Sequence, residues 1–186
     1  MQIICIVEES ADDYFSNEKQ RVMLPPSPCP HCNSKQVLRA LGYYDRDVSR
    51  LNEKGYIRIS VRRFRCIVCR KTVSLLPSFA QPYRIVLNAT IQAFAVGDIY
   101  HPDVEWWISH LRRYWKRFCF WLPYLLQSVP GIGLSPPSED AAAYWRRIVI
   151  WAGSLSNATE RLTRDFQVTL FGRYRCHAPN CCESGN

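Results

Sequence analysis

The chain has 186 residues, nine cysteines and a formal net charge of +8. This length suits one or two small domains. The apolar run at residues 2–7 is too short to cross a membrane and lacks the basic flank of a signal peptide. We therefore expect no membrane partner, and a reducing cytoplasmic location in which the cysteines stay free of disulfides.

The positive charge is concentrated in one part of the sequence. Residues 29–76 contain eleven Lys and Arg residues against three acidic residues, whereas residues 1–28 contain two against five. The remaining segments, 77–128 and 129–186, are close to balance. A strongly basic module of this kind is typical of proteins with a polyanionic partner, usually nucleic acid. A basic surface that serves only solubility is the alternative.

The first 28 residues contain one strand signal and one polar stretch. Residues 2–7 are apolar and predict a short buried strand that joins a sheet or covers its edge. Residues 8–24 are polar and acidic, which favours a solvated linker. We therefore interpret residues 1–28 as a strand and an acidic linker that precede the first domain.

Two Cys-x2-Cys pairs follow, separated by 33 residues. Cys29 and Cys32 form the first pair, and Cys66 and Cys69 form the second. Each pair can fold into a tight turn that presents two thiolates, and four thiolates complete a closed tetrahedral site whose usual occupant is Zn²⁺. An iron site with the same ligands, or simply buried or disulfide-bonded cysteines, are the alternatives. We predict a zinc ribbon over residues 29–76, with metal binding coupled to folding because so small a sheet has little apolar interior.

The residues around the two pairs also carry local predictions. His31 lies inside the first pair, and we expect it to be an exposed spacer rather than a ligand. The residue after each second cysteine often needs a left-handed backbone conformation in such turns. Asn33 tolerates that conformation well, and Arg70 does so less readily.

Three strands are predicted inside the ribbon, at residues 35–44, 56–65 and 72–76. In the second strand, apolar and polar residues alternate from Ile57 to Val61, which predicts one buried face. The alternation breaks at Arg62-Arg63, where we expect a β-bulge. Five basic residues would then line one side and edge of the ribbon as phosphate contacts, unless they serve only to keep an edge strand soluble. They are Arg58, Arg62, Arg63, Arg65 and Lys71.

After residue 77 the pattern becomes helical. Residues 83–96 and 104–122 predict two helices, with Pro102 and Asp103 suited to the start of the second. The second helix has an apolar stripe and an opposite basic arc that also holds aromatic side chains, a combination typical of nucleic-acid binding. A surface helix whose charges are merely solvated is the alternative. The predicted contacts on this helix are Trp106, Arg112, Arg113, Lys116 and Arg117.

The last segment, residues 129–186, predicts a helical hairpin and a cysteine-containing tail. We expect Ser138 to cap a helix over residues 139–152, and a second helix over residues 158–170. The tail contains Cys176, His177, Cys181 and Cys182. Two adjacent cysteines fit a single metal-binding turn poorly, which argues against a second metal site.

The run RRFRC-x2-C-RKT-x-SLLP-x-F-x2-PYR, together with CPHC, resembles the zinc-ribbon head of bacterial insertion-sequence transposases and of an uncharacterised family of transposase-like proteins. The resemblance covers residues 29 to about 120. It implies that the four cysteines of the two pairs bind zinc and that a helix-turn-helix in the following helices binds DNA. Two features depart from the family pattern. Only two helices are clear where such a helix-turn-helix has three, and residues 123–186 do not supply a transposase catalytic domain.

These patterns predict an α+β protein, with an N-terminal zinc ribbon built on a small antiparallel sheet and a mostly helical C-terminal half. They predict a zinc-binding and DNA-binding protein that is derived from a transposase or associated with transposition. Its expected partners are duplex DNA and a transposase or another protein chain. The rival hypothesis is a protein-interaction adaptor that binds no nucleic acid. We expect no enzymatic activity, because a four-thiolate zinc site leaves no open position for catalysis.

Overall fold

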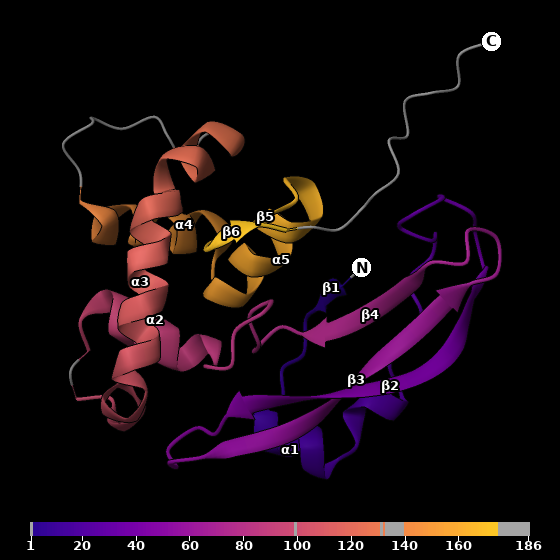
Figure 1. Cartoon of the computed structure of the whole chain (residues 1–186), viewed down its shortest axis with the longest axis horizontal. Helices are drawn as coiled ribbons and strands as arrows, with labels where there is room; N and C mark the ends of the chain where they lie inside the picture. The colour runs from indigo at the N-terminus through magenta and orange to yellow at the C-terminus, as the bar shows by residue number, and fades with distance from the viewer. Residues whose placement is uncertain (1, 99, 131, 133–139, 175–186) are drawn as a thin grey trace.

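The computed structural model describes residues 2–98, 100–130, 132 and 140–174. The N-terminal half contains a four-stranded sheet, and the C-terminal half is mostly helical (Figure 1). This arrangement confirms the predicted α+β class. None of the helices in the described part of the chain is long and apolar enough to cross a membrane.

The sheet has the strand order β1-β4-β3-β2. Strands β2 (Leu38–Ser49), β3 (Tyr56–Cys66) and β4 (Thr72–Pro77) are antiparallel neighbours. Strand β1 (Gln2–Cys5) pairs with β4 in parallel, so the sheet is mixed rather than purely antiparallel. The parallel pairing requires no tight turn, because more than sixty residues separate the two strands in sequence. The N-terminal strand therefore joins the sheet, as expected.

Residues 8–24 do not form a solvated linker. Ser10 caps helix α1 (Ala11–Ser16) by accepting a hydrogen bond from the backbone N–H of Asp13, and a short 3-10 turn, η1 (Lys19–Arg21), follows. Tyr14 on α1 is fully buried in the apolar cluster that covers one face of the sheet. The linker prediction is wrong because this acidic segment contains Tyr14, whose burial depends on tertiary contacts that the composition does not indicate.

We expect Tyr14→Ala to lower the free energy of unfolding by about 3 kcal/mol, because it removes a large side chain from a packed cluster. Phe15→Ala is the matched control, since the neighbouring Phe15 side chain is 52% exposed. That control should change the stability by less than about 1 kcal/mol. Urea denaturation of both variants measures the difference. Equal effects of the two substitutions would show that α1 does not anchor the sheet.

Strand β3 buries opposite faces at its two ends. Ile57, Ile59 and Val61 belong to the cluster that contains Tyr14. Phe64 and Cys66 lie on the other face of the sheet, in a smaller cluster at the metal-binding end. The sheet therefore has more apolar interior than its size suggested, and only one end of it depends on the cysteines.

This change of face also explains the interrupted alternation in β3. The pairing of β3 with β2 and β4 runs through Arg62 and Arg63 without a break in β3 itself. The register shift lies on the partner strand, between Ala40 and Gly42 of β2. The predicted bulge is therefore in β2 and not in β3, and it lies opposite the expected position.

The helical half has its own core. It is formed by α2 (Asn88–Val96), α3 (Pro102–Ser128), α4 (Ala141–Ala152), α5 (Leu155–Asp165) and the small hairpin of β5 (Val168–Thr169) and β6 (Gly172–Arg173). Leu111 and Phe118 of α3 and Trp145 of α4 are among its most deeply buried side chains. The predicted apolar stripe of α3 is therefore the face that packs against the other helices.

The helix boundaries differ from the predicted ones in several places. The α2 helix starts at Asn88 instead of residue 83, because Leu87 is extended and forms an isolated bridge with Ala80. The α3 helix is 27 residues long, since burial of its stripe continues through Leu125. Asp140 caps α4, whereas Ser138 lies outside the described residues. The β5–β6 hairpin, which the sequence analysis missed, replaces the end of the last predicted helix.

Polar contacts join the two halves. The side chain of Asn88 donates a hydrogen bond of 2.7 Å to the carbonyl of Ser78. Asp103, at the start of α3, is fully buried and accepts from the backbone N–H of Asn52 at 2.9 Å and from the hydroxyl of Thr90 at 3.2 Å. Asp103 therefore fastens the first turn of α3 to the turn between β2 and β3.

Candidate metal centre and basic helix face

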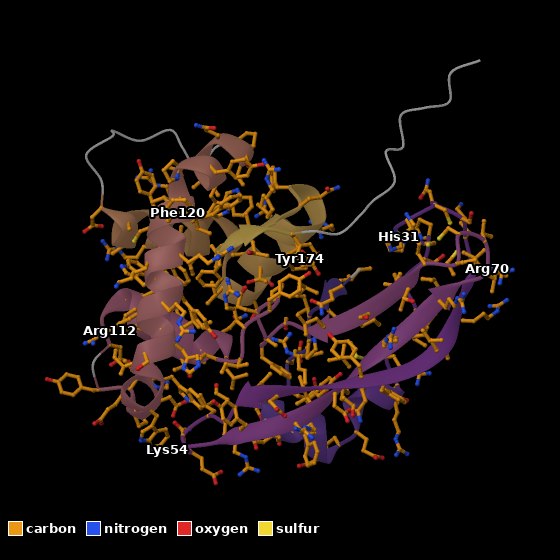
Figure 2. All side chains as sticks on the ribbon, in the orientation of Figure 1. His31, Lys54, Arg70, Arg112, Phe120 and Tyr174 are labelled. Atoms are coloured by element: carbon orange, nitrogen blue, oxygen red, sulfur yellow. The ribbon has the colours of Figure 1, made fainter. Side chains whose placement is uncertain are left out.

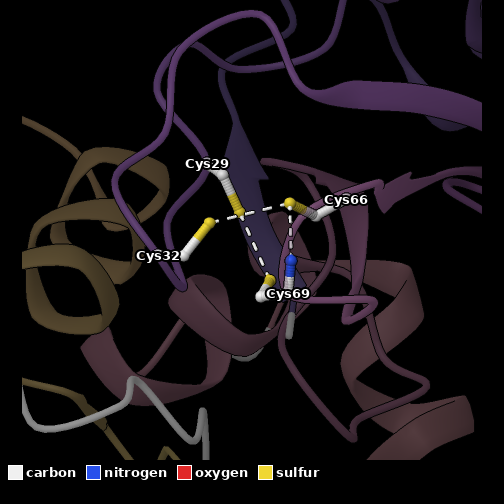
Figure 3. Close-up of side chains that lie close together, drawn as sticks. All are labelled: Cys29, Cys32, Cys66 and Cys69. Atoms are coloured by element: carbon white, nitrogen blue, oxygen red, sulfur yellow. Dashed lines mark hydrogen bonds between the residues drawn. The ribbon is translucent and has the colours of Figure 1, made fainter.

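The four predicted cysteines meet at one end of the sheet (Figure 3). Cys29 and Cys32 come from the loop before β2, Cys66 ends β3, and Cys69 lies in the turn before β4. Their four Sγ atoms all lie within 4.8 Å of one another. The β2–β3 pairing brings the two halves of the cluster together, because Leu38 is opposite Cys66.

The spacing of the sulfur atoms suits a metal ion. The Sγ atoms of Cys29 and Cys69 are 4.0 Å apart, and those of Cys32 and Cys66 are 3.6 Å apart. A disulfide would require about 2.05 Å, so these cysteines are free thiols. A tetrahedral ion with metal–sulfur bonds of about 2.3 Å places neighbouring sulfurs about 3.8 Å apart. The four side chains therefore form a group that could hold one metal ion.

The backbone of both turns has the predicted conformation. Asn33 and Arg70 adopt left-handed φ values of 58° and 62°. In the first turn, the N–H of Asn33 donates to the carbonyl of Cys29 at 2.9 Å. In the second, the N–H of Cys69 approaches the Sγ of Cys66 at 3.4 Å.

The thiols differ in their electrostatic surroundings. Burial raises the pKa of Cys69 to about 11 and also raises the pKa of Cys29. Hydrogen bonds from Ser34 lower the pKa of Cys32 to about 6. Because metal ions bind thiolates, binding at this site would release the protons that the buried thiols hold.

Two other predictions concern residues near the cysteines. His31 is buried rather than exposed, and it is not part of the four-residue metal-binding group. The exposed-spacer prediction for His31 is therefore wrong in its burial. The tail residues Cys176, His177, Cys181 and Cys182 lie outside the described part of the chain.

The five basic residues predicted on the ribbon do not form one surface. Arg58 and Arg62 lie on one face of β3, and Arg63 and Arg65 lie on the other, because side chains alternate along an uninterrupted strand. Lys71 is exposed in the turn before β4. The expectation of one continuous basic side and edge is thus wrong.

Three of these arginines also have partners within the protein. Arg58 makes two hydrogen bonds to the carboxylate of Asp47 on β2, at 2.9 and 3.3 Å. Arg62 donates to the hydroxyl of Tyr43, and its guanidinium lies 4.7 Å from the centre of that ring. The Nε of Arg65 donates to the carbonyl of Arg70 at 3.3 Å. Their contact with an external anion would have to compete with these interactions.

The basic face of α3, by contrast, is open. Arg112, Arg113, Lys116 and Arg117 are all exposed, and none of them forms an ion pair with a carboxylate in the described part of the chain. Arg117 is held in place by a 2.6 Å hydrogen bond from its Nε to the carbonyl of Phe171. Trp106 is 36% exposed on the same side of the helix. We name this set the α3 basic face.

The metal centre and the α3 basic face are far apart. In Figure 2, His31 and Arg70 mark the metal-binding end of the sheet, and Arg112 and Phe120 project from α3 on the opposite side of the molecule. The metal centre therefore cannot contribute directly to contacts made by α3. What it can do is hold the two cysteine turns at the end of the sheet.

One group of residues beside α3 was missed by the sequence analysis. Tyr83, Arg84 and Ile85 form a non-helical segment that begins in a turn, with Tyr83 at a left-handed φ of 61°, and lines a cleft with α3. The only signal was the PYR tripeptide at the end of the run that resembles transposase heads. The predicted helix over residues 83–96 would place these side chains differently, but α2 starts only at Asn88.

Comparison with known proteins gives one match. A family described as a domain of unknown function (DUF6431) matches residues 29–114. This range begins at Cys29, includes the other three clustered cysteines and ends at Tyr114, in the middle of α3. No curated protein and no solved structure matches the chain. The family description names neither an activity nor a ligand.

Proposed function

We propose that this protein binds duplex DNA through the α3 basic face, while one Zn²⁺ ion stabilises the far end of its sheet. The observation that carries the proposal is the set of four exposed cations on one helix without carboxylate partners in the described structure. Cations without carboxylate partners are available to contact phosphates. Each phosphate contact releases condensed counterions, and this release favours binding.

Zinc is the metal that we propose for the four cysteines. Four thiolates form a closed tetrahedral site, which is the usual structural zinc arrangement and holds the chain without taking part in catalysis. Iron bound by the same four ligands is the alternative, and it would give the purified protein a visible colour. The local role of the ion fits the small apolar cluster around it, which contains few large side chains besides Leu38, Phe64 and Leu75.

The helices α2 and α3 would act as the helix-turn-helix of this DNA-binding unit. The first turn of α3 is tied to the β2–β3 turn through Asp103 and Asn52, so it is not free to enter a groove. We therefore propose that the middle of α3, from Arg112 to Arg117, contacts the phosphate backbone, with Trp106 towards its start. The ribbon residues Arg63 and Lys71, which are not ion-paired in the described structure, would give secondary contacts.

The similarity to transposase heads suggests the context of this activity. We propose that the protein derives from a transposase or works beside one in the cytoplasm, since the run RRFRC to PYR spans the end of β3, the metal turn and the segment beside α3. The supporting observation is that this run joins the metal centre to the helical half. A transposase chain would then be a second partner.

Direct binding tests the proposal. The zinc-loaded chain is titrated into a fluorescein-labelled blunt DNA duplex at low salt, and fluorescence anisotropy is recorded. We expect saturable binding that an excess of unlabelled duplex of unrelated sequence reverses, since contacts to the phosphate backbone carry no sequence information. A chain that binds no duplex even at low salt would favour the rival function, a protein-interaction adaptor.

We also propose that the protein does not cut or join DNA strands. Those reactions usually require divalent ions held by several carboxylates. Of the three neighbouring acids between the end of α2 and the first turn of α3, Asp103 is fully buried and engaged with Asn52 and Thr90. Asp98 accepts a hydrogen bond from the backbone N–H of Tyr100. Neither side chain is arranged to share a metal ion with Glu105.

The measurement is incubation of the purified chain with supercoiled plasmid and Mg²⁺ or Mn²⁺. We expect the plasmid to stay supercoiled. Nicking that copurifies with the chain and that Glu105→Gln abolishes would contradict this expectation. Glu105 is suited to this test because it is exposed, so its substitution leaves the buried Asp103 contacts intact.

A further inference from the structure

A cleft lies between α3 and the segment of residues 83–85. Its volume is about 600 Å³, within the range of pockets that bind small molecules. Four cationic side chains line it: Arg84 from the segment, and Arg113, Lys116 and Arg117 from α3. None of the described residues that line it carries a carboxylate. The cleft therefore concentrates positive charge that the described residues around it do not balance.

Two of these cations are held in place by uncharged groups. The guanidinium of Arg84 lies 5.2 Å from the ring centre of Tyr114 and 5.3 Å from that of Phe171. Its NH1 group donates to the carbonyl of Tyr83 at 3.0 Å. Arg117 donates to the carbonyl of Phe171 at 2.6 Å. Burial, together with the nearby charge of Arg117, lowers the pKa of Arg84. Fixed like charges repel one another, and a bound anion would relieve that repulsion.

Aromatic side chains stand at the same cleft. Phe120 is 85% exposed, and it lies four residues after Lys116 and three after Arg117, on the same side of α3. Tyr83 lies across the cleft from the helix residues and is 63% exposed. A phenylalanine ring forms no hydrogen bond with water, so its exposure to solvent is unfavourable. Its position beside the cations points to a planar partner.

We propose that this cleft binds an unpaired nucleotide of a DNA strand, with the phosphate held by the cations and the base stacked on Phe120. The combination of a basic groove and exposed aromatic rings is how proteins hold single strands, because every base offers a flat face for stacking. Bases inside an intact duplex are already stacked on their neighbours and cannot reach the ring. This inference rests on the proposed DNA binding and deepens it, since it names a strand end or junction as the preferred substrate.

The test compares two DNA ligands by fluorescence anisotropy with the zinc-loaded full chain. One is a blunt duplex, and the other is the same duplex with a short single-stranded overhang. The comparison is made once with the overhang at the 5′ end and once with it at the 3′ end. We expect the overhang to increase affinity about tenfold, which is typical of stacking one base on an aromatic ring. Phe120→Ala should remove that preference and leave the blunt-duplex affinity within about twofold, whereas Phe120→Trp should retain it.

Tyr100→Ala is the matched control, because Tyr100 is an exposed aromatic residue, 90% accessible, that does not line the cleft. It should keep the preference for the overhang. Equal affinity of the wild-type chain for both ligands, or a preference that survives Phe120→Ala, would overturn the inference while leaving duplex binding in place. Binding of the overhang ligand without binding of the blunt duplex would instead support the cleft and contradict the proposed duplex function.

Discussion

Replacing Cys66 with serine should abolish metal binding and unfold one end of the sheet. Cys66 is fully buried, and its Sγ lies 3.6 Å from that of Cys32, so no other side chain can take its place without a rearrangement of the turn. Structural zinc contributes an apparent binding free energy of about 10–16 kcal/mol in small zinc domains, most of which would be lost. We expect the metal content to fall from one zinc per chain to nearly none.

The structural effect should be local. The metal end has its own small apolar cluster, whereas α1 and the helical half are packed in two other clusters. Hydrogen–deuterium exchange should therefore increase at the backbone hydrogen bonds of the two cysteine turns, such as Cys29 to Ser34 and Cys66 to Lys71. The amides of α3 should keep their protection, because α3 packs in a different apolar cluster from the one at the cysteines.

Cys119→Ser is the control for this experiment. Cys119 is an exposed free cysteine on α3 and lies outside the metal-binding group. Its substitution should leave the zinc content at one per chain, as measured by inductively coupled plasma mass spectrometry. A Cys66→Ser protein that retains stoichiometric metal and wild-type exchange at both turns would show that the four cysteines do not form a structural metal site.

Neutralising the α3 basic face should have the largest effect on DNA affinity. In the triple variant Arg112→Gln, Arg113→Gln and Lys116→Gln, three exposed cations without carboxylate partners in the described structure are lost. Each phosphate contact contributes about tenfold in affinity near 0.1 M salt, so the loss should be on the order of several hundredfold. Fluorescence anisotropy with a blunt duplex measures it.

Arg58→Gln provides the matched control for the triple variant. Arg58 is an exposed arginine of the sheet, but its guanidinium already pairs with Asp47 at 2.9 Å. Because this pairing holds the Arg58 charge within the protein, the substitution should change DNA affinity by no more than about threefold. The variant Arg62→Gln, Arg63→Gln and Arg65→Gln should weaken binding less than the α3 triple variant. A larger loss from the ribbon variants than from α3 would place the DNA on the sheet instead.

The features that the sequence predicted well are those with local signals. The four cysteines could be identified from spacing alone, and the left-handed residues Asn33 and Arg70 followed from the geometry of each turn. The buried stripe of α3 followed from its apolar periodicity. In each case a few neighbouring residues determine the conformation, so no knowledge of the tertiary structure was required.

The features that the sequence did not predict depend on contacts between distant segments. Tyr14 is buried because α1 packs against β3, whereas the acidic residues around Tyr14 predicted a solvated linker. The sequence indicated only that Asp103 suits the start of a helix, whereas the structure shows its carboxylate accepting a hydrogen bond from Asn52, about fifty residues earlier. The cleft is the clearest case, since Arg84 and Phe120 line it from segments whose proximity no local pattern indicates.

The arginines of β3 illustrate a further difficulty. The sequence places Arg62, Arg63 and Arg65 close together, and a basic surface was the natural interpretation. An uninterrupted strand sends Arg62 to one face and the other two to the opposite face, while a neighbouring tyrosine on β2 accepts a hydrogen bond from Arg62. The sequence therefore predicts the net charge of residues 29–76 but not the surface on which that charge lies.

The most direct test of DNA binding through α3 is the salt dependence of duplex affinity for the zinc-loaded wild-type chain. The logarithm of the affinity should fall linearly with the logarithm of the salt concentration, with a slope of about −0.9 for each phosphate neutralised. If all four cations of the α3 basic face contact phosphates, the slope should be about −3.6 or steeper, and the α3 triple variant should flatten it by about 2.7. A slope near zero, or a slope that the triple variant leaves unchanged, would contradict DNA binding by this helix.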